Sequence, residues 1–145
     1  MKAKEIIALL PYQEPFLFVT DLESVNENGV TGSHTFLKSA DFYKGHFKTK
    51  AITPGVILTE TMAQIGLVAL GIYLMSLEQK KTNNIQIGMT STEIDFFIPV
   101  LPGETVRVES VKEYFRFNKL KCAVKMFNKN NELVCRGIIA GMIKI

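Results

Sequence analysis

The feature that most constrains the fold is a long apolar segment that begins at Pro54 and Gly55 and continues, without another proline, to about Gln79. Its hydrophobic residues leave almost no polar face; they are Val56, Ile57, Leu58, Met62, Ile65, Leu67, Val68, Leu70, Ile72, Leu74 and Met75. A helix that is apolar on all sides is buried, either by the rest of its protein or by a membrane. The sequence therefore predicts one long helix and a structure that surrounds it.

A membrane span is the competing interpretation of this helix. Its stretch without charges, from Thr61 to Leu77, has 17 residues and contains Gln64 and two glycines. That length is at the bottom of the range that spans a bilayer. We therefore expect a buried core helix and no insertion into a membrane.

The rest of the chain is mostly strand-like. A short helix over residues 3–10, stopped by Pro11, is expected to act as a lid or cover. Strands are predicted before the long helix and after it, at residues 16–25, 30–37, 85–98, 105–117, 120–128 and 133–145. The Asn28-Gly29 pair suits a tight hairpin with positive φ, and a change of apolar phase predicts a bulge near Ser110. These elements predict one α+β domain, residues 1–145, in which a curved antiparallel sheet wraps the helix.

Composition narrows the functional classes. The formal net charge is only +3, and charged residues make up an ordinary 21% of the chain, which argues against a nucleic-acid surface. Cys122 and Cys135 lie in apolar strand-like sequence without a nearby histidine cluster, so we expect buried thiols in a reducing compartment and no metal site. Charged residues interrupt the first ten positions, unlike a signal peptide. We expect a cytoplasmic protein.

Glu60 is the residue that packing alone does not explain. It lies on the second turn of the apolar helix, where an unpaired carboxylate is costly to bury. It is either a structural residue, paired with a cation or capping its helix, or a general acid whose pKa is raised by desolvation. Gln64, one turn later on the same face, can hydrogen-bond the carboxylate in either case.

The chain has two histidines. His46 stands in the segment Gly45-His46-Phe47 just before the helix, where an irregular loop can present a functional group. A lone histidine is more often structural than catalytic, so His46 gains weight only beside a partner. His34 lies within the predicted strand 30–37, and we interpret it as a partly exposed strand residue.

The start of the long helix is a third candidate. In Thr53-Pro54-Gly55-Val56, the proline and glycine leave backbone N–H groups free at the positive end of the helix dipole. Such an end can stabilise a developing oxyanion. An ordinary helix start has the same sequence pattern.

Taken together, these segments resemble the FabZ-type 3-hydroxyacyl-[acyl-carrier-protein] dehydratases. The resemblance rests on Gly45-His46-Phe47, on Pro54-Gly55-Val56-Ile57-Leu58-Thr59-Glu60-Thr61-Met62-Ala63-Gln64, and on the interval of fourteen residues from His46 to Glu60. Further matches are Leu9-Leu10-Pro11, Pro15-Phe16-Leu17-Phe18-Val19, Phe96, Pro99-Val100 and Pro102-Gly103-Glu104. The resemblance covers about the first 115 residues.

The resemblance implies a hot dog fold whose protomers join edge to edge and form two active sites at the dimer interface. His46 of one subunit is then expected to remove the C2 proton of a 3-hydroxyacyl thioester, and Glu60 of the other to protonate the departing hydroxyl. The N–H of Gly55 is expected to polarise the thioester carbonyl. This chemistry needs no metal and no organic cofactor.

The resemblance also implies the partners. The substrate is expected to arrive on an acyl carrier protein, and the assembly to be a homodimer or a trimer of dimers. The residues expected to contact the substrate are Gly55, Val56, Gln64, Phe96 and Phe97. The pathway is expected to be fatty-acid synthesis or a related secondary one, such as polyketide-like or aryl-polyene synthesis.

The chain departs from the family pattern at several positions. Lys48 and Tyr12 stand where the family commonly has proline and histidine. The basic residues that flank the later phenylalanine in the family are replaced by Asp95, Phe97 and Ile98. Carrier docking is therefore expected to use other cations, for which the candidates are Lys48, Lys50 and the Lys80-Lys81 pair, or the carrier is a different one.

Two other functions stay open on sequence alone. One is a hot dog acyl thioesterase, in which a carboxylate near the helix directs water or attacks the thioester. The other is a non-catalytic acyl-binding homologue that retains the pocket. Double-bond isomerisation is less expected, because relatives that isomerise carry aspartate where this chain has Glu60.

Overall fold

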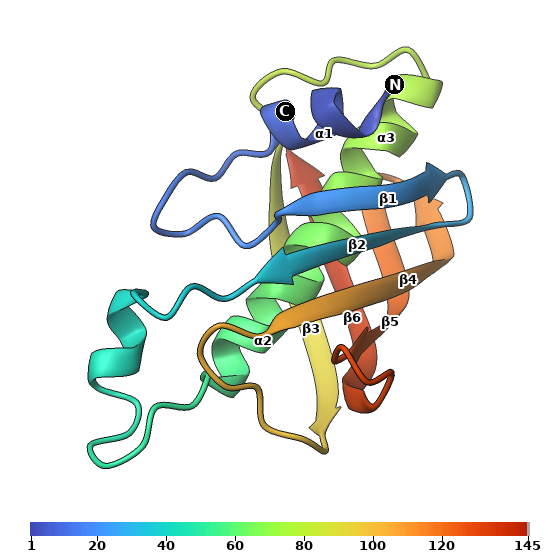
Figure 1. The fold of residues 1–145 in the computed structure, drawn as a ribbon. Helices are drawn as coiled ribbons and strands as arrows, with labels where there is room; N and C mark the ends of the chain where they lie inside the picture. The colour runs from blue at the N-terminus through green and yellow to red at the C-terminus, as the bar shows by residue number, and fades with distance from the viewer. Residues whose placement is uncertain (145) are drawn as a thin grey trace.

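The computed structural model describes residues 1–144. One antiparallel sheet of six strands, in the order β1-β2-β4-β5-β6-β3, curves around a central helix (Figure 1). The strands are β1 (Asp21–Asn26), β2 (Gly29–Thr35), β3 (Gln86–Phe96), β4 (Thr105–Arg116), β5 (Lys119–Phe127) and β6 (Leu133–Lys144). The helices are α1 (Ala3–Leu9), η1 (Asp41–Lys44), α2 (Gly55–Ala63), η2 (Gln64–Ala69) and α3 (Leu70–Leu77).

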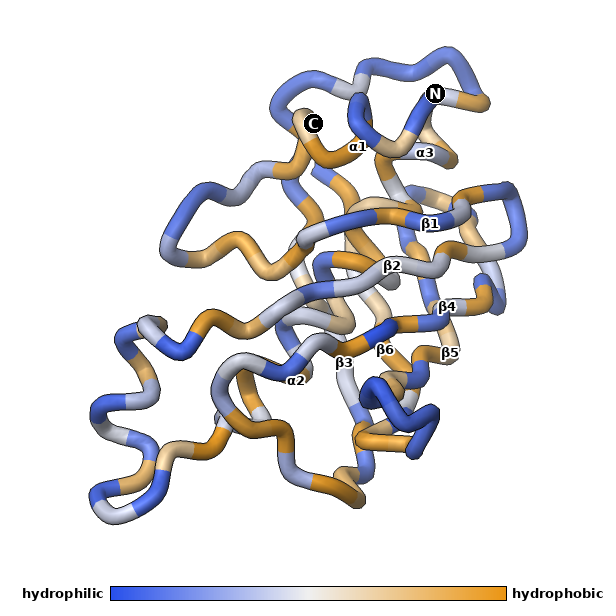
Figure 2. The backbone as a smooth tube through the Cα atoms, in the orientation of Figure 1, coloured by the Kyte–Doolittle hydropathy of each residue, from blue (hydrophilic) through white to orange (hydrophobic). Residues whose placement is uncertain are grey.

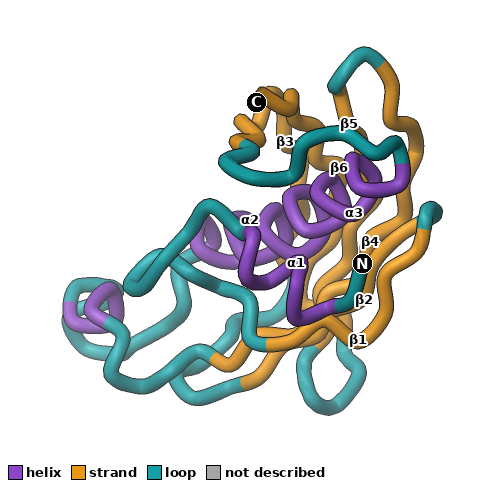
Figure 3. Tube along the Cα trace, turned by 90° about the horizontal axis from the view of Figure 1, so that it is seen from above, coloured by secondary structure: helices purple, strands orange, loops and turns teal. Residues whose placement is uncertain are grey.

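The central helix is continuous from Gly55 to Leu77 through α2, η2 and α3. It is long and apolar enough to cross a membrane, yet 72% of its most apolar window is buried inside the protein. Figure 3 shows the sheet lying along the helix. The prediction of a buried core helix is confirmed, and the sheet provides the cover that its apolar surface requires. Its middle part, η2, is a π-helix, which the sequence did not predict.

Ser110 connects the sheet to this π-helical segment. Its hydroxyl donates a 2.8 Å hydrogen bond to the carbonyl of Gly66, and its side chain is buried. The predicted bulge at Ser110 is wrong by about three residues, because the register between β4 and β5 shifts between Lys112 and Tyr114. Ser110 keeps the inward phase of Val106 and Val108, since its hydroxyl has an acceptor inside the core.

The first predicted strand is also too long. Strand β1 begins at Asp21, and the residues before it form an irregular segment that approaches the helix. The turn to β2 forms at Glu27 and Asn28, and neither Asn28 nor Gly29 has positive φ. Instead, the N–H of Asn28 donates to the side chain of Asn26 at 2.8 Å, which stabilises the turn locally.

The other elements follow the sequence closely. Ile6 of α1 is fully buried, and α1 contacts β1 and α3, as expected of a cover. Cys122 and Cys135 are buried free thiols, as predicted. Gly103 has a φ of 89° in the predicted turn after Pro102, a conformation that favours glycine. Figure 2 shows apolar residues along the helix and polar residues in turns such as that between β5 and β6.

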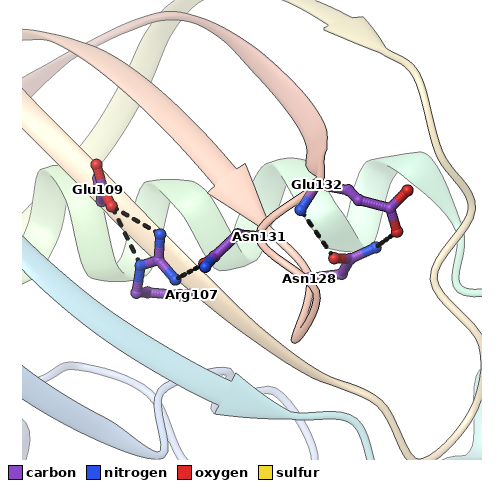
Figure 4. Close-up of polar contacts among 5 residues, drawn as sticks. All are labelled: Arg107, Glu109, Asn128, Asn131 and Glu132. Atoms are coloured by element: carbon purple, nitrogen blue, oxygen red, sulfur yellow. Dashed lines mark hydrogen bonds and ion pairs between the residues drawn. The ribbon is translucent and has the colours of Figure 1, made fainter.

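Side chains tie the turn between β5 and β6 to β4. Arg107 donates to Asn131 at 2.8 Å and forms an ion pair with Glu109 at 3.0 Å (Figure 4). Within the turn, Asn128 and Glu132 bond to each other through side chain and backbone. This turn therefore has its own polar support, at a distance from the helix start.

The two edges of the sheet differ. Strand β1 has 6 residues, whereas β3 has 11 residues, most of them exposed. A long edge strand carries unpaired backbone groups that can pair with another chain. One helix wrapped by a curved antiparallel sheet is the predicted α+β hot dog architecture.

Candidate active site

His46 is held on a short loop before the central helix. Its Nδ1 lies 2.8 Å from the carbonyl oxygen of Ile52, and the N–H of Ile52 donates to the His46 carbonyl at 2.9 Å. A carbonyl can only accept, so Nδ1 carries the proton and Nε2 is left as the basic nitrogen. The Phe47 ring stacks on the imidazole with centroids 3.9 Å apart. The loop therefore fixes both the tautomer and the direction of His46.

The same loop leads directly into the helix start. The N–H of Thr53 donates to the carbonyl of Val100 at 2.9 Å, and the Tyr43 hydroxyl bonds to the Thr53 hydroxyl. The first N–H groups of a helix lack partners within the helix and lie at its positive end. The hydrogen bonds at Thr53 therefore hold the short segment that connects the His46 loop to the N–H groups at the helix start.

Gly55 begins the helix beside an aromatic ring. A Cβ placed on Gly55 would lie 3.4 Å from Cε1 of Phe96, so the ring packs closely on the glycine. Val56 is 76% exposed on the outer side of the helix start, and Phe97 is half exposed beneath the guanidinium of Arg136, 5.7 Å from its ring centroid. The structure thus places Gly55 and Phe96 together, while Val56 and Phe97 point toward solvent in the single chain.

Glu60 and Gln64 form the predicted i,i+4 pair. Nε2 of Gln64 donates to Oε2 of Glu60 at 2.9 Å. Burial raises the pKa of the Glu60 carboxyl, and the hydrogen bond from Gln64 opposes part of that increase. The structural alternative of a cationic partner is not realised, because no Lys or Arg within residues 1–144 forms an ion pair with Glu60. The carboxyl is therefore suited to carrying a proton.

Tyr12 is a neighbour of Glu60 that the sequence did not assign to the site. Burial and, to a smaller extent, the negative charge of Glu60 raise the pKa of its phenol to about 12. The Tyr12 ring also lies 6.5 Å from that of Phe16, in the segment that Gln64 binds. The only sequence signal was its position, where the resembled family commonly has histidine.

His46 and Glu60 do not meet within one chain. No hydrogen bond joins them among the described residues, and the His46 loop projects beyond the sheet, away from the helix (Figure 1). In the same described part of the chain, no three His, Cys, Asp or Glu side chains are grouped to hold a metal ion. His46, Glu60 and the helix start are each held by local contacts within residues 1–144.

Comparison with known proteins identifies the family of this chain. A FabA-like domain matches residues 10–137. The chain is similar to 3-hydroxyacyl-[acyl-carrier-protein] dehydratases FabZ from several bacteria. It is 34% identical to that of Clostridium perfringens over 109 residues, 75% of each chain. It is 32% identical to that of Sinorhizobium medicae, over 97% of this chain and 88% of the relative.

Solved structures confirm the fold. A chain of the dehydratase heterocomplex ApeI:P from Xenorhabdus doucetiae superposes with a TM-score of 0.80 at 10% identity, over 97% of this chain and 91% of that one. A thioesterase from Haemophilus influenzae superposes with a TM-score of 0.68 at 11% identity, over 99% and 91%. Likeness at such low identity shows the hot dog fold alone, whereas the domain match over residues 10–137 identifies the chain as a member of the FabA-like domain family.

Proposed function

We propose that this protein dehydrates a 3-hydroxyacyl thioester, carried on an acyl carrier protein, to the trans-2-enoyl thioester. The proposal rests on the state of two side chains, His46 before the helix start and Glu60 after it. His46 has its Nδ1 proton engaged by Ile52 and its Nε2 available, and Glu60 has a raised pKa. The FabZ relatives are named for the same reaction.

His46 acts as the base. The C2 proton of a thioester is acidic only when the enolate charge on the carbonyl oxygen is stabilised, and the N–H of Gly55 at the positive end of the helix supplies that stabilisation. Nε2 of His46 takes the proton from C2. The Ile52 carbonyl stabilises the imidazolium that results, because it accepts from Nδ1.

Glu60 acts as the acid. The C3 hydroxyl leaves as water only if it receives a proton, and the raised pKa of the Glu60 carboxyl favours the protonated form that supplies it. Because Gln64 occupies Oε2, the proton is assigned to Oε1. In the complete reaction, His46 gains the proton from C2 and Glu60 gives its proton to the leaving oxygen. The C3–O bond breaks, and a double bond forms between C2 and C3. Proton exchange with solvent then resets both groups.

The site is completed by a second copy of the chain. The exposed β3 edge pairs with the same edge of the partner in an isologous homodimer, and this brings His46 of each subunit to Glu60 of the other. A trimer of such dimers is a further assembly open to the chain. The acyl carrier protein delivers the substrate, and the protein acts in the cytoplasm without a cofactor.

Mixed dimers test the sharing of the site. His46→Ala and Glu60→Gln each abolish both sites of a homodimer, whereas a heterodimer of the two variants regains one intact site. Random reassortment of equal amounts makes half of the dimers mixed, so turnover recovers to about a quarter of wild type. No recovery, with heterodimer formation confirmed by native mass spectrometry, would place each site within one chain.

Mass spectrometry of the products distinguishes this reaction from its alternatives. Incubation with 3-hydroxyacyl carrier-protein thioesters of graded length is expected to yield species that have lost one water and retain the carrier. Free carrier thiol without an unsaturated product would identify a thioesterase. Tight binding without either product over hours would identify an acyl-binding protein.

A further inference from the structure

A cavity of about 610 Å³ lies beside the helix start. Its walls come from the segment before β1, the end of β2, η1 and one residue of α2. Figure 1 shows the segment before β1 and the segment after β2 projecting from the same end of these strands. The volume is within the range of about 300–1,000 Å³ that is usual for small-molecule sites.

Several aromatic rings contribute to the wall of this cavity. They are Phe16, Phe18, Phe36 and Phe42, with the imidazole of His34 among them. Phe18 is in edge contact with Phe16 at 4.9 Å and with His34 at 5.7 Å, and His34 is perpendicular to Phe36 at 4.8 Å. Perpendicular rings present both edges and faces, which suits a flat unsaturated group better than a flexible alkyl chain.

The cavity adjoins the proposed catalytic acid. Ile57 of α2 lines the cavity, and Glu60 follows it by three residues on the same face of the helix. Phe16 also lines the cavity, and its carbonyl accepts from the Gln64 amide that binds Glu60. An acyl chain with C3 near Glu60 can therefore extend its far end into the cavity.

His34 provides one directed polar group in this wall. Its Nδ1 lies 3.0 Å from the Thr20 hydroxyl, and that hydroxyl already accepts the N–H of Thr35. Because this hydroxyl already accepts from Thr35, we assign it as the donor to Nδ1, which places the ring proton on Nε2. Burial lowers the pKa of His34 to about 4, which keeps the imidazole neutral. His34 thus offers a neutral N–H donor.

We propose that this cavity binds the distal end of the acyl substrate, and that it selects an aromatic end carrying a neutral oxygen that accepts a hydrogen bond from Nε2 of His34. An anionic end is disfavoured, because the acidic residues Glu14 and Asp41 are among those that line the cavity, and Lys44 forms an ion pair only with Asp41, at 3.3 Å. This inference rests on the proposed dehydration for its substrate class, while the cavity itself does not depend on the chemistry.

Three synthetic thioesters of N-acetylcysteamine test the preference. Their acyl groups are 3-hydroxy-5-(4-hydroxyphenyl)pentanoyl, 3-hydroxy-5-phenylpentanoyl and 3-hydroxyoctanoyl. Wild type is expected to have a kcat/KM for the hydroxyphenyl substrate about fivefold to tenfold above that for the phenyl substrate. One hydrogen bond to a partly buried donor contributes a factor of this size. The octanoyl substrate is expected to be the poorest of the three.

Variants test whether His34 and Thr20 cause the preference for the hydroxyphenyl substrate. His34→Phe is expected to bring the ratio of hydroxyphenyl to phenyl kcat/KM to about one, and His34→Gln, which keeps an N–H donor, to retain part of the ratio. Thr20→Val is expected to lower the ratio and to move the imidazole nitrogen NMR signals of His34 toward the other tautomer. Glu27→Gln, at the opposite end of β1 and β2, is the control and leaves the ratio unchanged. An equal ratio in wild type and in a folded His34→Gln or Thr20→Val protein would overturn the proposal.

Direct binding separates this inference from the proposed function. If wild type turns over none of the three thioesters, saturation-transfer NMR with the same compounds measures their affinities. Tighter binding of the hydroxyphenyl compound, lost in His34→Phe or Thr20→Val, supports the cavity assignment although dehydration has failed. Turnover of all three at equal efficiency refutes the cavity assignment while dehydration stands.

Discussion

The side-chain amide of Gln64 joins the carboxyl of Glu60 to the segment that precedes β1. Nε2 donates to Glu60 at 2.9 Å and to the carbonyl of Phe16 at 3.0 Å, while Oε1 accepts the N–H of Phe18 at 2.8 Å. Gln64 has no exposed surface. If its amide were reversed, Nε2 would face the N–H of Phe18, and two donors would meet. One buried side chain thus sets the position of the proposed acid and of one wall of the aromatic cavity.

Gln64→Leu should destabilise the protein strongly. It leaves the N–H of Phe18 and the carbonyl of Phe16 without their partner, at a cost of about 2–4 kcal/mol in the free energy of unfolding. Urea denaturation measures this cost. Gln13→Leu makes the same chemical change on an exposed residue outside β3 and should shift the stability by less than about 0.5 kcal/mol. Equal effects of the two substitutions would show that the buried network adds nothing.

The raised pKa of Glu60 has consequences for both rate and stability. As an acid, Glu60 must be protonated, so kcat/KM should fall on the alkaline side at a pH above the ordinary glutamate value. Since the folded pKa is above the unfolded one, the stabilising contribution is present below the unfolded pKa and is lost as the pH rises through the folded pKa. Glu60→Gln should therefore be inactive but more stable than wild type at pH 7, with no such gain at pH 3. Unfolding curves at the two pH values check the difference, and a variant less stable than wild type at pH 7 would refute it.

The lowered pKa of His34 predicts the opposite dependence of stability on pH. Its folded pKa of about 4 lies below the unfolded value of 6.5, so its contribution is complete above pH 6.5 and is lost as the pH falls toward 4. The ring is partly exposed, so we expect a loss of about 1–2 kcal/mol after allowance for solvent screening. The loss should be smaller in His34→Gln. Parallel stability profiles of wild type and variant between pH 7 and 4 would contradict a half-buried, neutral imidazole.

Gly137 is required where β6 passes β3. A Cβ at this position would lie 2.0 Å from the backbone carbonyl oxygen of Glu93, so Gly137→Ala must displace one strand. We expect a loss of stability of about 3 kcal/mol or more and a weaker dimer, because β3 forms the proposed interface. Gly88→Ala on the same strand pair meets nothing within 4 Å in the single chain, so the thermal stability of the fold should change little. Thermal unfolding and sedimentation velocity compare the two variants.

The central helix and the strands were predictable because their patterns are strong and continuous. An apolar run with a proline at its start fixes Gly55 to Leu77, and the site residues resemble a family motif in one short stretch. The break between β4 and β5 was predicted, but the conformation of the turn was not, since Phe117 and Asn118 both have positive φ and a phenylalanine rarely adopts it. The segment before β1 looked like a strand because its side chains are apolar, but it pairs with Gln64 and encloses the cavity instead.

The roles of Tyr12 and His34 depend on tertiary neighbours, which no local pattern shows. Tyr12 lies near Glu60 only because the chain returns to the helix after α1. His34 was interpreted as a partly exposed strand residue; it is half-buried in β2, and its hydrogen bond to Thr20 gives it a direction. The meeting of His46 with Glu60 requires a second chain and stays a prediction.

Dehydration of a 3-hydroxyacyl carrier-protein thioester by wild type and His46→Ala tests the central claim most directly. His46 is proposed as the base and lies in an exposed loop region, so its loss should spare the fold while turnover falls by about two to four orders of magnitude. Circular dichroism confirms that the variant is folded. Turnover equal to that of wild type in a folded His46→Ala protein would contradict the account.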